Sequence, residues 1–115
     1  MTNDPQALLP LPPVTFHILV ALSDGDHHGY AIIQDIAART GGELKIQAGT
    51  LYRSIQRMLE QGLVVETHAR DIGDDERRRY YRITELGTAV AKAEARRLTQ
   101  LVRMARAAGF TPSRA

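Results

Sequence analysis

Residues 47–63 read QAGTLYRSIQRMLEQGL, and this stretch decides the fold. At the advance of about 100° per residue of an α-helix, one side collects the apolar side chains Leu51, Ile55, Met58 and Leu59. The opposite side carries Gly49, Arg53, Gln56, Arg57 and Glu60. A charged, solvated outer face is the common structural meaning of this pattern. Arginine and glutamine are also the residue types that contact phosphates and base edges, so the segment predicts a helix with a core face and a face able to read DNA.

Two shorter helices are expected before this segment. In PVTFHILVAL, residues 13–22, proline suits a first helical turn, and the predicted core side chains are Phe16, Leu19, Val20 and Leu22. In HHGYAIIQDIAARTGG, residues 27–42, paired glycines favour a helix end after the helically spaced Tyr30, Ile33, Ile36 and Ala37. The order of helix, helix, short turn and helix is the order that a helix-turn-helix requires.

Two short β-type runs follow the 47–63 segment. Residues 63–67 and 80–84 are rich in β-branched and aromatic side chains, and a polar turn around Gly73 joins them. Because an isolated two-stranded hairpin is marginal in water, this one is expected to pack on the helices, as a wing does. The predicted fold class is mainly α with a small β-hairpin, which is a winged helix-turn-helix.

A long helix is expected after the hairpin. Thr84 suits its N-cap, and Glu85 adds favourable negative charge to its first turn. Residues 85–108 contain no proline and are rich in alanine, leucine and arginine, which favours about six helical turns. Their apolar stripe is broader than a helix at a domain edge could bury, and it consists of Leu86, Val90, Ala93, Leu98, Leu101, Val102 and Ala105.

The 115 residues are expected to form one domain, whose stability would gain from surface buried in a dimer. We expect a flexible N-terminal arm at residues 1–11, a winged helix-turn-helix at 12–84, a C-terminal dimerisation helix at 85–109 and a tail at 110–115. Without cysteine, disulfides and thiolate chemistry are excluded. A secretory signal and a long apolar segment are also absent, so we expect a soluble, cytoplasmic protein without a membrane partner.

Positive charge is unevenly distributed along the chain, although the net charge is only +2. Residues 1–44 contain one basic and five acidic residues, whereas residues 45–64 contain three basic residues and one acidic residue. Residues 85–115 contain six basic and two acidic residues. Positive charge therefore begins where the 47–63 helix begins, which is consistent with a nucleic-acid partner for that helix.

Four short motifs follow one another along the chain: His28-Gly29-Tyr30, Gly49-Thr50-Leu51-Tyr52-Arg53, Leu59 with Gly62-Leu63, and Tyr81-x-Ile83-Thr84-x-x-Gly87. In this order and spacing they resemble the PadR family of transcriptional regulators, and the likeness runs over residues 12–108. The single C-terminal helix is similar to the smaller branch of that family. The resemblance implies a winged helix that binds double-stranded operator DNA and typically represses transcription. It also implies a homodimer, and an effector that is a small apolar or aromatic compound; no cofactor is expected.

The resemblance also assigns roles to residues. Glycine at position 49 allows close backbone approach, and the Thr50 hydroxyl suits a phosphate. Arg53, Gln56 and Arg57 are the candidates for the major groove. Tyr30 is equally consistent with a contact to the DNA backbone and with a place in the core or interface. The full expected DNA-binding set is Tyr30, Gln47, Gly49, Thr50, Tyr52, Arg53, Gln56, Arg57, Arg77, Arg78 and Arg79. The expected dimerisation set is Phe16, Leu86, Val90, Leu98, Leu101, Val102 and Ala105.

The sequence departs from the family pattern in two places. Gln47-Ala48 stands where the family often has a small hydroxyl residue followed by proline, so we expect a less firmly capped third helix. The hairpin tip holds four acidic residues, Asp71, Asp74, Asp75 and Glu76. Because phosphates would repel these carboxylates, the arginines at the base of the wing are better candidates for DNA contacts.

Other chemistries find less support in the sequence. Four histidines occur, but there is no cysteine and no HxxxH spacing for closed zinc coordination, so no metal site is predicted. Because no nucleophile motif and no phosphate-binding glycine loop occur, we do not expect an enzyme. The competing class is a winged helix that binds another protein through the same basic face and has no operator.

Overall fold

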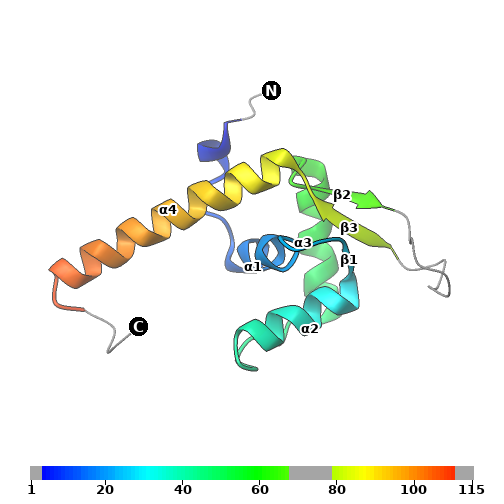
Figure 1. Cartoon of the computed structure of the whole chain (residues 1–115), viewed down its shortest axis with the longest axis horizontal. Helices are drawn as coiled ribbons and strands as arrows, with labels where there is room; N and C mark the ends of the chain where they lie inside the picture. The colour runs from blue at the N-terminus through cyan, green and yellow to red at the C-terminus, as the bar shows by residue number, and fades with distance from the viewer. Residues whose placement is uncertain (1–3, 68–78, 111–115) are drawn as a thin grey trace.

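The described part of the chain consists of a short 3-10 helix, three α-helices, a small sheet and one long α-helix (Figure 1). The computed structural model describes residues 4–67 and 79–110. In chain order the elements are η1 (Pro5–Leu8), α1 (Pro13–Ala21), β1 (His27–His28), α2 (Gly29–Arg39), α3 (Ala48–Gln61), β2 (Val64–Thr67), β3 (Tyr80–Ile83) and α4 (Glu85–Ala107). The predicted winged helix-turn-helix with a long C-terminal helix is confirmed.

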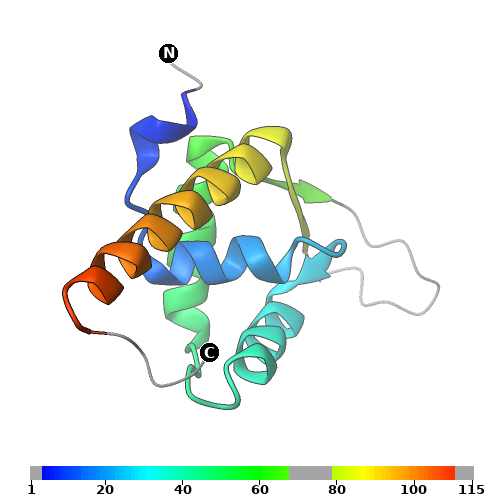
Figure 2. The same cartoon turned by 60° about the vertical axis from the view of Figure 1, so that its left-hand side comes forward.

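The hydrophobic core lies where α1, α2 and α3 meet beneath the first half of α4 (Figure 2). From α3 it takes Leu51, Ile55 and Met58, each at most 2% exposed, so the predicted core face is confirmed for these three residues, and Leu59 packs against the core but is only partly buried. From α1 it takes Ile18 and Leu19. Of the other predicted α1 core residues, Phe16 is partly buried and packs against the core, whereas Val20 is partly buried and is not part of it; both border a groove beside α4.

Helix α2 is rotated relative to its sequence-based prediction. Its fully buried side chains are Ile32 and Ile36, whereas Ile33 is partly buried and Tyr30 is 62% exposed. The first turn of α2 packs against α3 through Gly29, which leaves Tyr30 on the outside. Tyr30 is therefore not a core residue.

The sheet has three antiparallel strands in the order β1-β3-β2, one more than the predicted hairpin. The dipeptide His27-His28 pairs with β3, so that His27 lies opposite Tyr81. Two residues are too few to show a strand-type alternation, and this strand is specified only by its partner. His28 also caps α2 by accepting a hydrogen bond at Nδ1 from the Ala31 N–H (3.1 Å), and its ring packs edge-on against Tyr80.

Capping residues that can be recognised in the sequence set the helix boundaries. Gly62 ends α3 with a φ of 78°, in the left-handed region that favours glycine. Thr84 is the N-cap of α4, as predicted, and its Oγ1 accepts a hydrogen bond from the Gly87 N–H (2.9 Å). The single proton of the same hydroxyl is shared between the carbonyl oxygens of Gly62 (2.6 Å) and Leu63 (3.0 Å). Thr84 therefore joins the start of α4 to the end of α3.

The described part of the N-terminal segment packs on α4, in contrast to the flexible arm expected for residues 1–11. Leu11 is 6% exposed, and its N–H donates to Oε2 of Glu94 (3.3 Å), a carboxylate that is itself 2% exposed. Arg97 holds that carboxylate with two hydrogen bonds of 2.6 and 2.8 Å. The expectation of a poorly ordered arm does not hold for the described residues of this segment, because Pro5–Leu8 form a 3-10 helix and Leu11 belongs to the core. A proline-rich backbone can be ordered when its leucines are buried and its N–H groups have acceptors.

Substitution of glutamine for Glu94 is expected to lower the free energy of unfolding at pH 7 by about 1–3 kcal/mol, because charge-assisted bonds to Arg97 are lost. Hydrogen bonding to Arg97 holds the pKa of Glu94 below its usual value. The carboxylate therefore stabilises the fold above the unfolded-state pKa, and this contribution is lost as pH falls through the lower folded-state pKa.

The measurement is urea denaturation of both proteins between pH 7 and pH 3.5. The difference between them should shrink as the pH falls below the ordinary pKa of glutamate, about 4.3. Glu43→Gln, the same change at an exposed position, serves as the control. A stability difference that stays constant across this range would show that the charge of Glu94 does not stabilise the fold.

Candidate nucleic-acid interface

The outward face of α3 is fixed by the burial of its other side. With Leu51, Ile55 and Met58 in the core, the exposed residues of this helix include Gly49, Tyr52, Arg53, Gln56, Arg57 and Glu60. Two contacts within α3 are long, from Arg53 Nη2 to Thr50 Oγ1 (3.4 Å) and from Gln56 Nε2 to Glu60 Oε2 (3.5 Å). Such long contacts leave the polar groups available to a ligand.

The first turn of α3 has unused hydrogen-bond donors. Its N-cap is Gln47, whose side chain makes no capping hydrogen bond, as expected from the Gln47-Ala48 departure. The first N–H groups of a helix have no acceptor within the helix and carry partial positive charge, so they suit a phosphate. Gly49 and Thr50 lie in this turn, and the half-buried Thr50 contacts Arg53.

Tyrosines border the outward face of α3 on the side of α2. A Cβ atom at Gly29 would collide with the phenol of Tyr52, so the absence of a side chain at Gly29 makes room for that ring. Tyr52 is 47% exposed and Tyr30, the next residue after Gly29, is 62% exposed. Both tyrosines are therefore partly exposed, which removes the core alternative for Tyr30 and leaves the DNA-backbone and interface alternatives open.

The arginines at the base of the wing are partly neutralised. Arg82 makes a bidentate ion pair with Asp26 (3.0 and 2.9 Å), which joins β3 to the segment before β1. Arg79 lies 3.7 Å from the carboxylate of Glu66 on β2, and its side chain is 74% exposed. Because Asp26 and Arg82 are 56 positions apart, no local pattern indicates this pairing. The other two wing arginines of the expected DNA-binding set, Arg77 and Arg78, lie outside the described residues.

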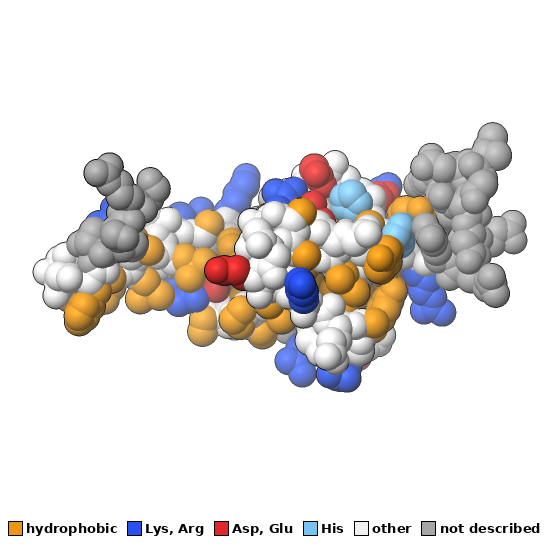
Figure 3. Space-filling view, turned by 90° about the horizontal axis from the view of Figure 1, so that it is seen from below, with side chains coloured by type: hydrophobic (Ala, Val, Ile, Leu, Met, Phe, Trp, Pro, Cys, Tyr) orange, Lys and Arg blue, Asp and Glu red, His pale blue; other side chains and the backbone are white. Residues whose placement is uncertain are grey.

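The outer half of α4 extends beyond the three-helix core (Figure 1). Leu98, Leu101 and Val102 are 36–45% exposed, and hydrophobic side chains gather along the projecting arm that this half of α4 forms (Figure 3). Two members of the expected dimerisation set are not exposed as that set requires. Val90 is fully buried in the core of its own chain, so its assignment to a dimer interface was wrong, and Leu86 is partly buried against that core.

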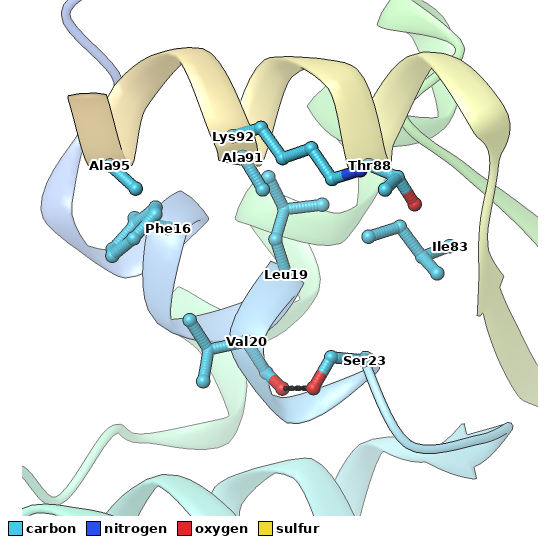
Figure 4. A pocket seen from close by; sticks show the side chains of 9 residues that line it. All are labelled: Phe16, Leu19, Val20, Ser23, Ile83, Thr88, Ala91, Lys92 and Ala95. Atoms are coloured by element: carbon cyan, nitrogen blue, oxygen red, sulfur yellow. Dashed lines mark hydrogen bonds between the residues drawn. The ribbon is translucent and has the colours of Figure 1, made fainter. Parts of the chain in front are cut away.

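An apolar groove of about 340 Å³ lies between α1 and α4 (Figure 4). Phe16 points from α1 toward Ala95 on α4, and the alkyl chain of Lys92 runs along α4 toward Thr88 (Figure 4). Its remaining lining residues are Leu19, Val20, Ser23, Ile83 and Ala91. Because Leu98 and Val102 continue the helical spacing of Ala91 and Ala95, the groove and the exposed stripe of α4 form one apolar strip.

Residues 4–67 and 79–110 contain neither a cluster of metal ligands nor a membrane-spanning helix. In this part of the chain His, Asp and Glu side chains do not gather in threes around a possible metal ion. The described helices are also too short or too polar to cross a membrane. The acidic cluster Asp74-Asp75-Glu76 lies outside these residues.

Comparison with known proteins places this arrangement in a family. Residues 18–93 match the Transcriptional regulator PadR-like family. An uncharacterized protein from Lysinibacillus sphaericus is 43% identical over 72 residues, which are 63% of this chain and 65% of that relative's length.

Solved structures with the same fold include several regulators. A transcriptional regulator from Clostridium thermocellum is 29% identical, with a TM-score of 0.71 over 81% of this chain and 86% of that one. A PadR family transcription regulator from Clostridium difficile R20291 has a TM-score of 0.71 at 21% identity, over 83% and 96% of the two chains. Bacillus subtilis PadR in complex with operator DNA has a TM-score of 0.62 at 18% identity, over 73% and 47%. The family match spans more than half of the sequence, and the chain belongs to the PadR-like family of transcriptional regulators.

Proposed function

We propose that the chain is a sequence-specific regulator of transcription that inserts α3 into the major groove of double-stranded DNA. The observation that carries this proposal is the outward face of α3, where arginine and glutamine lie opposite a fully buried apolar face. A helix of this kind, supported by two others and flanked by a small sheet, has the dimensions and donors for direct readout of bases. A related fold from Bacillus subtilis was solved with operator DNA, which supports the same partner here.

The side chains divide into readers and anchors. Arg53 and Gln56 lie near the middle of the outward face and suit base edges, since arginine pairs with guanine and glutamine with adenine. Tyr30, Tyr52 and the uncapped first turn of α3 suit phosphates on the flanks of the groove. Arg79 at the base of the wing suits a neighbouring phosphate, and the same role is proposed for Arg77 and Arg78.

A homodimer built on α4 would present two such helices to one operator. The exposed stripe of α4 includes Leu98, Leu101 and Val102, and a second copy of the same stripe is its natural complement. Phe16 borders the groove that continues this stripe, so α1 would take part as well. Two α3 helices about 34 Å apart would then bind successive major grooves of a pseudo-palindromic site.

Release from the operator would be controlled at the apolar groove between α1 and α4. A groove of about 340 Å³ lined mainly by apolar side chains suits a small apolar or aromatic effector. Because the groove is continuous with the proposed dimer stripe, an effector bound there would change how the two copies pack and so the separation of the two α3 helices. A repressor that binds its operator only without the effector would behave in this way.

The proposal is tested by selecting bound fragments from genomic DNA with the purified protein and measuring their affinity across salt concentrations. A DNA reader should select defined sequences, bind them more weakly as salt rises, and keep a preference over random duplex. Failure to select any sequence, together with salt-independent or absent binding, would favour the protein-interaction alternative.

Alanine at Arg53 is expected to weaken binding to the selected operator by about 1–3 kcal/mol and to relax the preference at one base pair per half-site. The measurement is a competition titration with operators carrying each single base change. Arg96→Ala removes the same charge from an exposed position on the side of α4 away from its apolar stripe, and it should change neither affinity nor preference. Equal effects of the two substitutions would mean that Arg53 does not contact a base.

A further inference from the structure

A second, polar pocket lies between α3 and the first turn of α1. Its volume is about 190 Å³, and it is lined by Pro12, Thr15, Thr50, Arg53, Ser54 and Arg57. These residues supply two guanidinium groups and three hydroxyl groups, and the described lining contains no carboxylate. Such a set of donors is complementary to a small oxyanion.

The first turn of α1 adds backbone donors at this place. Pro12 is its N-cap and offers no side-chain capping bond, and Pro13 has no N–H. The first intrahelical bond from this turn is that of the Phe16 N–H to the Pro12 carbonyl (3.2 Å). The N–H groups of Val14 and Thr15 therefore have no acceptor within the helix, and the helix dipole makes this end electropositive.

Thr15 is the feature that points to a ligand. Its residue is only 5% exposed and lines the pocket, yet its hydroxyl has no hydrogen-bond partner in the described part of the chain. A threonine within a helix commonly bonds the carbonyl four residues earlier, as Thr99 does with Ala95 (2.8 Å). The side chain is more than nine-tenths buried, but Oγ1 is not a fully enclosed atom, so the Thr15 hydroxyl reaches the pocket surface and is available to a molecule there.

The two arginines of the pocket are held differently. Arg53 is folded toward the first turn of α3, with Nη2 3.4 Å from Thr50 Oγ1 and Nη1 near the position of a Cβ on Gly49. Arg57 lies one turn further along α3 and pairs with no carboxylate among the described residues. Ser54 is its neighbour on the side of α3 that faces α1.

We propose that this pocket binds one phosphate group, and that the backbone of the DNA read by α3 supplies it. The inference rests on the proposed function and divides its arginines into two roles. Arg57, with the Thr15 hydroxyl and the first turn of α1, holds a phosphate at the edge of the major groove, whereas Arg53 reads a base. A phosphate held by α1 also fixes the angle at which α3 enters the groove, because α1 and α3 pack directly on each other.

The first arm of the test measures DNA affinity against salt for Thr15→Val, Arg57→Ala and the control Arg96→Ala. Thr15→Val keeps the shape of the buried side chain and removes only the hydroxyl. It is expected to weaken binding roughly tenfold or more, on selected operator and random duplex alike, which leaves the preference unchanged. Arg57→Ala should reduce the slope of log affinity against log salt by about one, and Arg96→Ala should leave it unchanged.

The second arm titrates inorganic phosphate into the DNA-free protein and follows the amide resonances of Val14 and Thr15. Both resonances should shift in the wild type and shift less in Thr15→Val and Arg57→Ala. If Thr15→Val fails to fold, the surface substitution Arg57→Ala carries both arms.

The two arms separate the possible failures. Unchanged salt slopes and unshifted resonances in a protein that binds its operator overturn the pocket and leave the proposed function intact. Phosphate-dependent shifts with unchanged salt slopes overturn the DNA backbone as the source and assign the pocket to a free phosphorylated molecule. Phosphate-dependent shifts in a protein that binds no DNA overturn the proposed function and leave the anion pocket standing.

Discussion

Replacing Gly87 with alanine is expected to lower the free energy of unfolding by about 1–3 kcal/mol, although this substitution within a helix ordinarily raises it by up to about 1 kcal/mol. A Cβ atom at this position would collide with the carbonyl oxygen of Leu63 and lie 2.9 Å from Cγ1 of Ile83. The carbonyl cannot easily move away, because it accepts hydrogen bonds from the Thr84 N–H (3.0 Å) and from the Thr84 hydroxyl (3.0 Å). The strain therefore falls on the junction of α3, β2 and α4.

Gly49→Ala is the matched control, since it makes the same change in the first turn of a helix with space available. The nearest atom to its added Cβ would be Nη1 of Arg53 at 3.4 Å, the mobile end of a long side chain. Its stability should stay within a few tenths of a kcal/mol of the wild type or rise slightly. Urea denaturation of the three proteins makes the comparison, and similar stabilities for the two variants would show that α4 is not held tightly against Leu63.

Gly87 also marks how far the sequence predicts this fold. Its place in the motif that ends Tyr81-x-Ile83-Thr84-x-x-Gly87 identified it as a family position, but only the structure gives its role as the point where α4 touches a backbone carbonyl. Periodicity located the helices, and cap chemistry located Gly62 and Thr84, because those signals are local. Strand β1 pairs with β3 and residues 5–11 pack on α4, so both depend on partners far along the chain and no local pattern predicts them.

The candidate site also has one part that the sequence predicts and one part that only the structure shows. The outward face of α3 could be predicted because Leu51, Ile55 and Met58 fix the rotation of the helix about its axis. The pocket that adjoins this face could not be predicted from the sequence. Thr15 is an ordinary first-turn residue there, and only the structure shows that it is buried beside Arg57. Val90 was assigned to a dimer interface for the converse reason, since one apolar stripe on α4 serves first the core and then the exposed arm.

Glutamate at Leu101 is expected to weaken the proposed homodimer by about 100-fold or more, because each symmetric interface would bury two unpaired charges. Leu101 is 45% exposed in the single chain and lies beyond the part of α4 that packs on α1, so the fold itself should persist. Sedimentation velocity over a range of protein concentrations measures the change, with circular dichroism as the check on folding. Gln100→Glu adds the same charge on the side of α4 away from the stripe and should leave the dimer unchanged.

The same substitution separates dimerisation from DNA recognition. A folded Leu101→Glu monomer keeps the outward face of α3, so it should bind an isolated half-site as the wild type does. It should lose the additional affinity that the wild-type dimer gains on a complete operator, where binding of one half raises the effective concentration of the other. An unchanged dimer would reject α4 as the interface. A monomer that still binds the full operator with wild-type affinity would instead reject the paired arrangement of two α3 helices on successive grooves.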